Sequence, residues 1–303
     1  MIAELGLGLA VIGLLLFLLI LRIPIAFALA GAGLFALATA RPWPAVEFLL
    51  STFAYGASAN FAYVVLPLFL FMGHMAFAAG LSESAFAAGQ KWFGRFPGGL
   101  AAATVFGCAA FATICGSSVA TASTMSRVAM PEMRKQGYMP RLAAGCVAAG
   151  GTLGVLIPPS GVLVIYSIMT DVSLVKLFVA AFVPGIMTAI IYIIGIYIWV
   201  KMKPELAPQL KGAAVPTMRE KMQALGQTWE LLLLFAAVMG TIYLGVATPT
   251  EAAALGAFFA MLSVLRRPGR KENIGVGLRE TGTATCSIFA LVIGAGLFSL
   301  GLT

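Results

Sequence analysis

Long apolar runs separated by short polar segments form the main pattern of this sequence. Predominantly apolar runs lie at 5–21, 25–40, 61–80, 177–200, 231–246, 248–265 and 281–303. Most of them approach the roughly 20 residues that an α-helix needs to cross a bilayer. Strings such as LLLFLLIL lack the alternation of a transmembrane β-strand. With 61% hydrophobic and only 10% charged residues, the chain is predicted to be an all-α polytopic membrane protein.

The uncharged run at 98–126 carries a glycine and two hydroxyls near its middle, at Gly116, Ser117 and Ser118. Basic segments flank this run, QKWFGR before it and RVAMPEMRKQGYMPR after it, and the second is predicted to be a charged loop. Basic loops favour the cytoplasmic side, so the run between them is expected to enter the membrane and return. Non-helical backbone at membrane depth is tolerated only inside protein or beside a watery cavity. The pattern predicts a re-entrant hairpin of two half-helices, with close Gly/Ser helix packing as the alternative.

A second long run, at 142–170, is interrupted by IPPS at 157–160. Pro158 and Pro159 have no backbone N–H, and each disfavours helical geometry in the residue before it. A helix broken at mid-membrane presents carbonyls to cations and amides to anions. The sequence therefore predicts a broken helix that contributes to a binding site, with a simple proline kink as the alternative.

The net charge of +8 is carried largely by basic loops between the apolar runs, and the positive-inside rule explains them without a nucleic-acid partner. We expect these loops to face the cytoplasm. The predicted organisation is first-repeat scaffold helices, a first-repeat transport region, a cytoplasmic linker and the start of a second repeat, at 1–97, 98–200, 201–228 and 229–303. The sequence has no G-x-x-x-x-G-K-[ST] loop for phosphate, which argues against ATP hydrolysis by that route.

Two segments 225 residues apart resemble each other, RIPIAFALAGAGLFALATAR at 22–41 and ATPTEAAALGAFFAMLSVLR at 247–266. This alignment places Pro24 on Pro249. By the predicted orientation the first segment leaves the cytoplasm and the second enters it, which is the inverted-topology repeat of secondary transporters. Chance similarity between Ala-rich helices is the alternative. At this offset, counterparts of the hairpin and the break would fall beyond residue 303, so the second repeat is expected to be incomplete.

Two motifs, GSSVATASTMSRVAMPEMRKQGY and GGTLGVLIPPSGVLVIYSIMTDVSLVKLFVAAFVPG, resemble the large membrane subunit of tripartite ATP-independent periplasmic (TRAP) transporters. GTIYLGVATPTEAAALGAFFAML resembles the second-half motif of that family. The resemblance implies an elevator-type fold of the ion-transporter superfamily and Na⁺-coupled import of organic acids such as dicarboxylates, keto acids or sialic acids. It also implies a small TRAP membrane subunit, a periplasmic substrate-binding protein and a multi-pass location in the bacterial inner membrane.

Carried over from the family, the candidate site combines the hairpin tip with the broken helix. The residues implied to bind substrate or ion are Gly116, Ser117, Ser118, Thr121, Thr152, Gly154, Pro158, Pro159 and Ser160. Na⁺, the coupling ion, is expected at Ser117, Ser118 and Gly154, and no cofactor or catalytic residue is expected. The family's second hairpin and second proline break are not found in these 303 residues, so we do not expect transport by this chain alone.

Three other functions fit the sequence less well. An intramembrane hydrolase would use Ser118 as nucleophile and His74 as base, but His74 lies in FMGHMAF and no carboxylate has an evident orienting role. A channel or a purely structural membrane subunit would not need broken helices and an inverted repeat. The nearest alternative is an ion-coupled carboxylate carrier that works without a binding protein.

The four cysteines and Glu251 lie in apolar runs, and each is interpreted as a structural residue. Glu251 lies near the expected start of a helix, where a negative charge is favourable. The four cysteines form no C-x-x-C pair and are interpreted as small core residues: Cys108, Cys115, Cys146 and Cys286.

Overall fold

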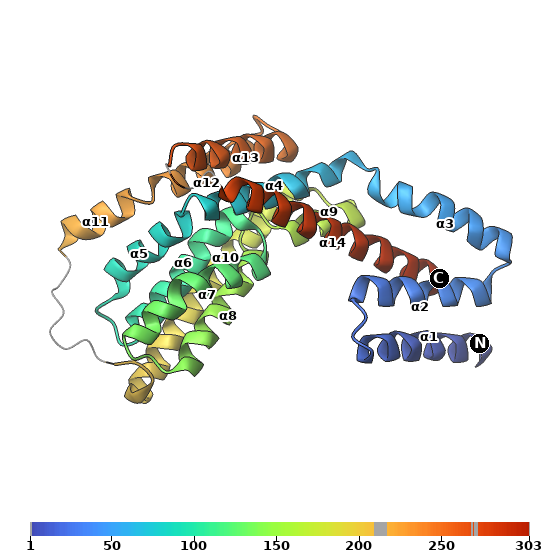
Figure 1. Ribbon diagram of the computed structural model, residues 1–303, viewed down its shortest axis with the longest axis horizontal. Helices are drawn as coiled ribbons and strands as arrows, with labels where there is room; N and C mark the ends of the chain where they lie inside the picture. Colours follow the sequence, from blue (N-terminus) through green and yellow to red (C-terminus); the bar gives the residue numbers. More distant parts are fainter. Residues whose placement is uncertain (1, 209–216, 268, 270–271, 303) are drawn as a thin grey trace. The chain divides into compact units, whose positions relative to one another are not determined.

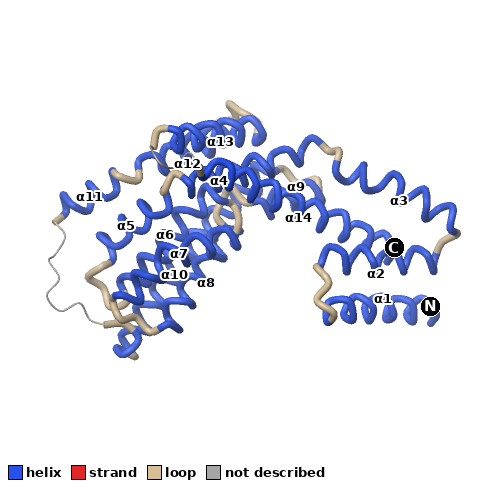
Figure 2. Tube along the Cα trace, in the orientation of Figure 1, coloured by secondary structure: helices blue, strands red, loops and turns tan. Residues whose placement is uncertain are grey.

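The computed structural model of the chain describes residues 2–208, 217–267, 269 and 272–302. Within these residues the regular elements are all helices, and Figure 2 draws helices and loops without a strand. The all-α prediction is therefore confirmed. The chain divides into two compact units, one of Met1–Val64 with Gly282–Thr303 and one of Val65–Thr281.

The first unit consists of apolar helices around a small core. Its elements are α1 (Ile2–Ile20), α2 (Ile25–Ala40), α3 (Trp43–Ser58), the short η1 (Phe61–Val64) and the C-terminal part of α14 (Asn273–Leu302). Glycines bring α2 and α14 into backbone contact, since a Cβ on Gly33 would lie 2.5 Å from the carbonyl carbon of Leu297. Small buried side chains such as Ala32 and Ala36 line the same side of α2, as is typical of helix pairs in membranes.

The second unit contains both interrupted runs. Its elements are α4 (Val65–Ala78), α5 (Leu81–Phe93), α6 (Gly99–Cys115), α7 (Ser118–Lys135), α8 (Pro140–Leu156), α9 (Gly161–Thr170), α10 (Leu174–Met202), η2 (Pro204–Leu206), α11 (Met218–Gly226), α12 (Trp229–Tyr243), α13 (Pro249–Leu265) and the start of α14. Figure 1 shows α6, α7, α8 and α10 side by side in green to yellow. The predicted break at 157–160 separates α8 from α9.

Helices α6 and α7 form an antiparallel hairpin. At its open end the backbone N–H of Leu100 donates a 3.1 Å hydrogen bond to the hydroxyl of Tyr138. One turn farther along α6, Thr104 Oγ1 lies 3.5 Å from Met133 Sδ. The two basic flanks therefore lie at the same end of the hairpin, as the charge pattern predicts, while the re-entrant position of the hairpin in a membrane stays a prediction.

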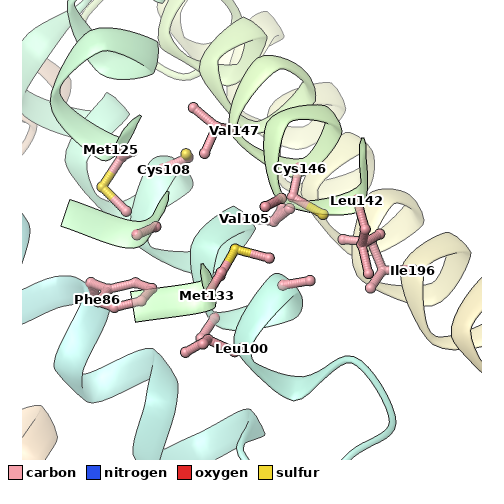
Figure 3. Close-up of a cluster of buried hydrophobic side chains, with 14 of the residues drawn as sticks. Phe86, Leu100, Val105, Cys108, Met125, Met133, Leu142, Cys146, Val147 and Ile196 are labelled. Carbon is pink, nitrogen blue, oxygen red and sulfur yellow. The ribbon is translucent and has the colours of Figure 1, made fainter. Parts of the chain in front are cut away.

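An apolar core joins the hairpin to α8 and α10, and Figure 3 shows part of it. Close contact between α6 and α8 depends on small residues, because a Cβ on Gly150 would lie 2.6 Å from Cys108 Sγ. Cys108, Cys115 and Cys146 are buried as predicted, but Cys286 is exposed. The interpretation of Cys286 as a core residue was wrong, because its side of α14 is not covered by another helix of its unit.

The charged segment after the hairpin tip is helical over 127–135, so its prediction as a loop is wrong there, and the loop is confined to 136–139. Helix α7 continues through Pro131 to Lys135. Met125, Ala129 and Met133 recur every four residues and are completely buried, so one face of the helix remains apolar through the polar stretch. Packing of that face stabilises the helix where local composition suggests a loop.

The predicted cytoplasmic linker at 201–228 also contains helical structure, in η2 and α11. Residues 209–216 of this linker lie outside the described residues. The polar stretch before the hairpin is the helix α5. Both α5 and α11 have one buried side, in agreement with polar helices that pack on the protein.

The described helices include several that are long and apolar enough to cross a membrane: Phe61–Ala78, Pro140–Thr170, Leu174–Met202 and Asn273–Leu302. The bent pair of α11 and α12 is a further candidate, and α1, α2, α6 and α13 are shorter apolar helices. These lengths indicate a multi-pass membrane protein.

The two segments of the proposed repeat are both helices with matching bounds. Shifted by 225 residues, α2 falls on 250–265, and α13 spans Pro249–Leu265. Glu251 completes a capping box with Thr248 at the start of α13, so its interpretation as a helix-terminal residue is confirmed. The inverted topology of the two segments stays a prediction.

Candidate functional site

The hairpin tip is a two-residue turn. Helix α6 ends at Cys115, and Gly116 takes the left-handed conformation at φ 63°, which glycine adopts without a steric cost. Ser117 has extended geometry and its Oγ accepts a 3.4 Å hydrogen bond from the backbone N–H of Ala120. Ser118 then begins α7. The sequence GSS therefore ends one helix, reverses the chain and caps the next helix.

The break between α8 and α9 has a different structure. Ile157 leaves helical geometry, and the Pro158–Pro159 peptide bond is cis. Ser160 is the N-cap of α9, but its side chain makes no capping hydrogen bond. All residues from Ile157 to Ser160 are buried. The break therefore lies inside the protein, as predicted for irregular backbone in a membrane-grade segment.

The tip and the break are in direct backbone contact. The N–H of Gly161 donates a 3.0 Å hydrogen bond to the carbonyl of Gly116. A Cβ on Gly116 would lie 2.5 Å from the carbonyl oxygen of Pro159. Glycine is thus required at 116 both for its φ angle and for this close approach.

Glycines on α8 bring it equally close to α7. A Cβ on Gly154 would lie 2.6 Å from the carbonyl oxygen of Ser117 and 2.7 Å from Thr121 Oγ1. A Cβ on Gly151 would lie 2.6 Å from the Cβ of Ala122. The predicted site residue Gly154 therefore lies against the hairpin tip.

Four helix ends meet in this region. The last carbonyls of α6 and α8 lack partners within their own helices and carry partial negative charge, while the first amides of α7 and α9 carry partial positive charge. The contacts of Gly116 with Pro159 and of Gly154 with Ser117 keep these ends together. One small region can thus attract a cation to carbonyls and an anion to amides.

Two buried hydroxyls at this crossing have no hydrogen-bond partner within the described residues. They are Thr121 Oγ1 and Ser160 Oγ, and both residues are completely buried. The thiol of Cys115 interacts weakly with the Thr121 side chain, but the Thr121 hydroxyl has no partner with hydrogen-bond geometry. A buried unpaired hydroxyl is costly, so each is a candidate ligand atom.

The donor set fits a hard cation. Apart from the Cys115 thiol, the candidate ligand atoms around the crossing are hydroxyl and carbonyl oxygens, which suit Na⁺ better than they suit softer metals. Among the described residues, His, Cys, Asp and Glu form no group of three that could hold a metal. The residues that fit Na⁺ through side-chain oxygens are Ser117, Thr121 and Ser160, and Gly154 contributes space and backbone.

Not all predicted site residues are brought together. Thr152 is exposed on α8, and its hydroxyl lies 3.3 Å from the hydroxyl of Tyr192 on α10. Ser118 is half-buried beside the tip. Gly150, Gly151 and Gly154 face the hairpin, whereas Thr152 points to another side of the same helix. Its role as a ligand stays a prediction.

Helix α4 also borders the site, and the sequence did not indicate this. A Cβ on Gly73 would lie 2.8 Å from the Cα of Cys115. Leu66 lies next to Gly161, with its Cδ2 3.6 Å from the position of a Cβ there. The small residue Gly73 in an apolar helix was the available signal, because small residues mark close helix contacts.

His74 on α4 has an acidic partner that was missed. Its Nδ1 lies 3.0 Å from Glu280 Oε2 on α14. In the sequence no carboxylate has an evident role in orienting His74, because the two residues are far apart along the chain. In the described structure His74 on α4 pairs with Glu280 on α14, whereas Ser118 begins α7.

Comparison with known proteins gives a consistent result. A family model described as "Tripartite ATP-independent periplasmic transporter, DctM component" matches residues 12–303. The chain is 34% identical over 250 residues to the C4-dicarboxylate TRAP transporter large permease protein DctM of Pseudomonas aeruginosa, covering 81% of this chain and 57% of the relative. It is 34% identical over 209 residues to the isethionate TRAP transporter permease protein DctMQ of Oleidesulfovibrio alaskensis, covering 69% and 32%.

A more distant relative is the sialic acid TRAP transporter large permease protein SiaM of Vibrio cholerae, 28% identical over 245 residues, covering 80% of this chain and 56% of the relative. The chain thus spans about half the length of the curated relatives it matches.

Proposed function

Because the chain belongs to the family of the DctM component of tripartite ATP-independent periplasmic transporters, we propose that it serves in the large permease of a Na⁺-coupled importer of organic acids. The proposal places it in the bacterial inner membrane with a small membrane subunit and a periplasmic substrate-binding protein. The relatives named above are permeases and not enzymes, and the proposal involves no chemical conversion of the substrate.

The observation that carries the proposal is the crossing of the hairpin tip with the helix break. Backbone hydrogen bonding of Gly161 to Gly116 keeps four helix ends together, and the unpaired hydroxyls of Thr121 and Ser160 are buried there. Oxygen atoms at helix C-termini are suited to Na⁺, and we propose that Thr121 and Ser160 complete its coordination. Thr121 replaces Ser118 as the stronger candidate because its hydroxyl is fully buried.

The class of substrate follows from charge. Neither 98–126 nor 142–170 contains Lys or Arg, so a substrate anion at this site would be attracted by helix N-termini and by the bound cation. Relatives are named for C4-dicarboxylate, isethionate and sialic acid. Organic acids are therefore the proposed class, and discrimination among them is assigned to the binding protein.

Na⁺ binding can be tested on this chain directly. In detergent, its melting temperature should rise with NaCl and not with equimolar KCl, since a ligand that binds the folded state stabilises it. In Thr121→Ala or Ser160→Ala, the Na⁺ concentration that gives half of the maximal rise in melting temperature should increase about 5- to 100-fold, which is the effect of losing one hydroxyl ligand. Thr113→Ala is the matched control, because its hydroxyl already donates to the Ala110 carbonyl. Identical NaCl and KCl curves for the unmodified chain would refute the cation site.

Transport is tested with the full-length permease and its small subunit in proteoliposomes. Uptake of a radiolabelled organic acid should need both a Na⁺ gradient and the purified binding protein. Uptake at the same rate without the binding protein would instead support a carrier that works alone.

A further inference from the structure

Helix α11, Met218–Gly226, lies between α10 and α12 along the chain, and its exposed side carries apolar and basic residues. Its start is fixed by a capping box, in which the N–H of Thr217 donates to Glu220 Oε2 at 2.7 Å and the N–H of Glu220 donates to Thr217 Oγ1 at 3.3 Å. After Gly226 the chain bends by 55° into α12. A helix of nine residues is marginal alone, so α11 depends on this cap and on its neighbours.

One side of α11 packs on α5. Ala224 is buried, and the ammonium of Lys221 lies 5.7 Å from the centre of the Trp92 ring. The side of α11 that carries Lys221 and Ala224 therefore faces α5. These contacts fix which side of α11 remains free.

The free side is apolar and basic. Met218 and Met222 follow each other by one turn and are 65% and 54% exposed. Arg219 is also exposed. On a helix with 3.6 residues per turn, Arg219 lies about 60° from Met222, on the side away from Lys221. An apolar stripe with a cation at its edge matches the boundary between lipid chains and headgroups.

The neighbouring ends of α5 and α10 also carry aromatic and basic side chains. Phe96, which follows α5, lies with its ring 6.4 Å from that of Tyr197 on α10, so the ends of these helices are neighbours. Lys201 lies 5.9 Å from the Tyr197 ring, and Trp199 is 48% exposed. Exposed aromatic rings with lysines and arginines are typical of the cytoplasmic membrane interface.

We propose that α11 lies in this interface with Met218 and Met222 among the lipid chains and Arg219 on the headgroup of an acidic phospholipid. The occupant is a bilayer lipid and not a soluble anion, because the cation and the exposed methionines form one continuous surface. Binding an acidic lipid through Arg219 anchors the connection between α10 and α12. This inference does not depend on the Na⁺ site.

The position of α11 is tested by spin labelling of the full chain in nanodiscs. A nitroxide at Met222→Cys, in a Cys286→Ser background because Cys286 is the exposed native thiol among those described, should collide with O₂ more than with a water-soluble nickel chelate. The matched control is Gln223→Cys, which is exposed about 100° around the helix and should favour the nickel chelate. Preference for nickel at Met222, or shielding from both reagents by a bound protein, would overturn the proposal.

Lipid preference is tested by native mass spectrometry with phosphatidylglycerol and phosphatidylcholine as the probes. Arg219→Ala should weaken phosphatidylglycerol binding about fivefold, the effect of removing one surface cation, while Arg219→Lys should keep it. Equal binding of the two lipids by the unmodified chain, or no change in Arg219→Ala, would contradict the proposal. Either result leaves the Na⁺ titration unaffected, so the two proposals fail separately.

Discussion

The hairpin tip and the helix break interrupt two helices in the same region but leave their polar groups in different states. At the tip, Gly116 reverses the chain and the hydroxyl of Ser117 caps α7. At the break, two prolines end α8, and the hydroxyl of Ser160 caps nothing although it is buried. The Ser117 hydroxyl at the tip therefore has a partner within its own helix, while the break buries a hydroxyl without one. The hydrogen bonds of these two hydroxyls therefore distinguish the two interruptions.

The largest effect is expected from Gly116→Ala. The added Cβ would clash with the carbonyl oxygen of Pro159, and alanine would have to adopt the left-handed conformation at φ 63°. Together these two effects should lower the free energy of unfolding by about 2–5 kcal/mol. The melting temperature in detergent should fall strongly. Gly145→Ala is the control on α8, because a Cβ at Gly145 meets nothing within 4 Å and a helical Ala for Gly is neutral or stabilising. Equal melting temperatures for the two variants would mean that Gly116 is not in close contact with the carbonyl of Pro159.

A smaller loss is expected from Ser117→Ala. This change removes the N-cap of α7 and should cost about 0.5–2 kcal/mol, measured as a lower melting temperature without Na⁺. Ser123→Ala, on the exposed side of the same helix, should leave the melting temperature unchanged. If Ser117→Ala is as stable as the control, then the tip is not capped by its own side chain and the contrast with the break disappears.

The smallest effect on stability is expected from Ser160→Ala without Na⁺. No hydrogen bond is lost, and an unpaired buried hydroxyl is removed, so stability should stay equal or rise. Thr104→Val provides the comparison, because the buried Thr104 hydroxyl donates to the Leu100 carbonyl at 2.9 Å and its loss should cost about 0.5–1.5 kcal/mol. A drop for Ser160→Ala as large as for Thr104→Val would show that Ser160 has a structural role.

The sequence predicted the interruptions well because glycine and proline act on the backbone directly. The positions of the tip and the break follow from Gly116, Pro158 and Pro159 without any knowledge of packing. The hairpin followed from the charge of its flanks. These signals are local, so they survive in a single sequence.

Features that depend on packing were predicted poorly. Helix α7 continues through Pro131 because its buried face packs on α6, and the local polar composition pointed the other way. Whether the Thr152 side chain faces the hairpin depends on which side of α8 packs against it. The pair of His74 and Glu280 joins two helices far apart along the chain. Such contacts require the tertiary structure.

The hydrogen bond between Gly161 and Gly116 has a consequence for how this site can change. Both its donor and its acceptor belong to the main chain, so no side-chain substitution removes either group except proline at 161. Exchange of other neighbouring side chains does not delete this bond, whereas a larger residue at 116 would push the two segments apart. Substitutions of the hydroxyl residues nearby therefore leave both partners of this bond in place. The two interrupted segments are thus joined by main-chain groups, independently of the hydroxyls buried beside them.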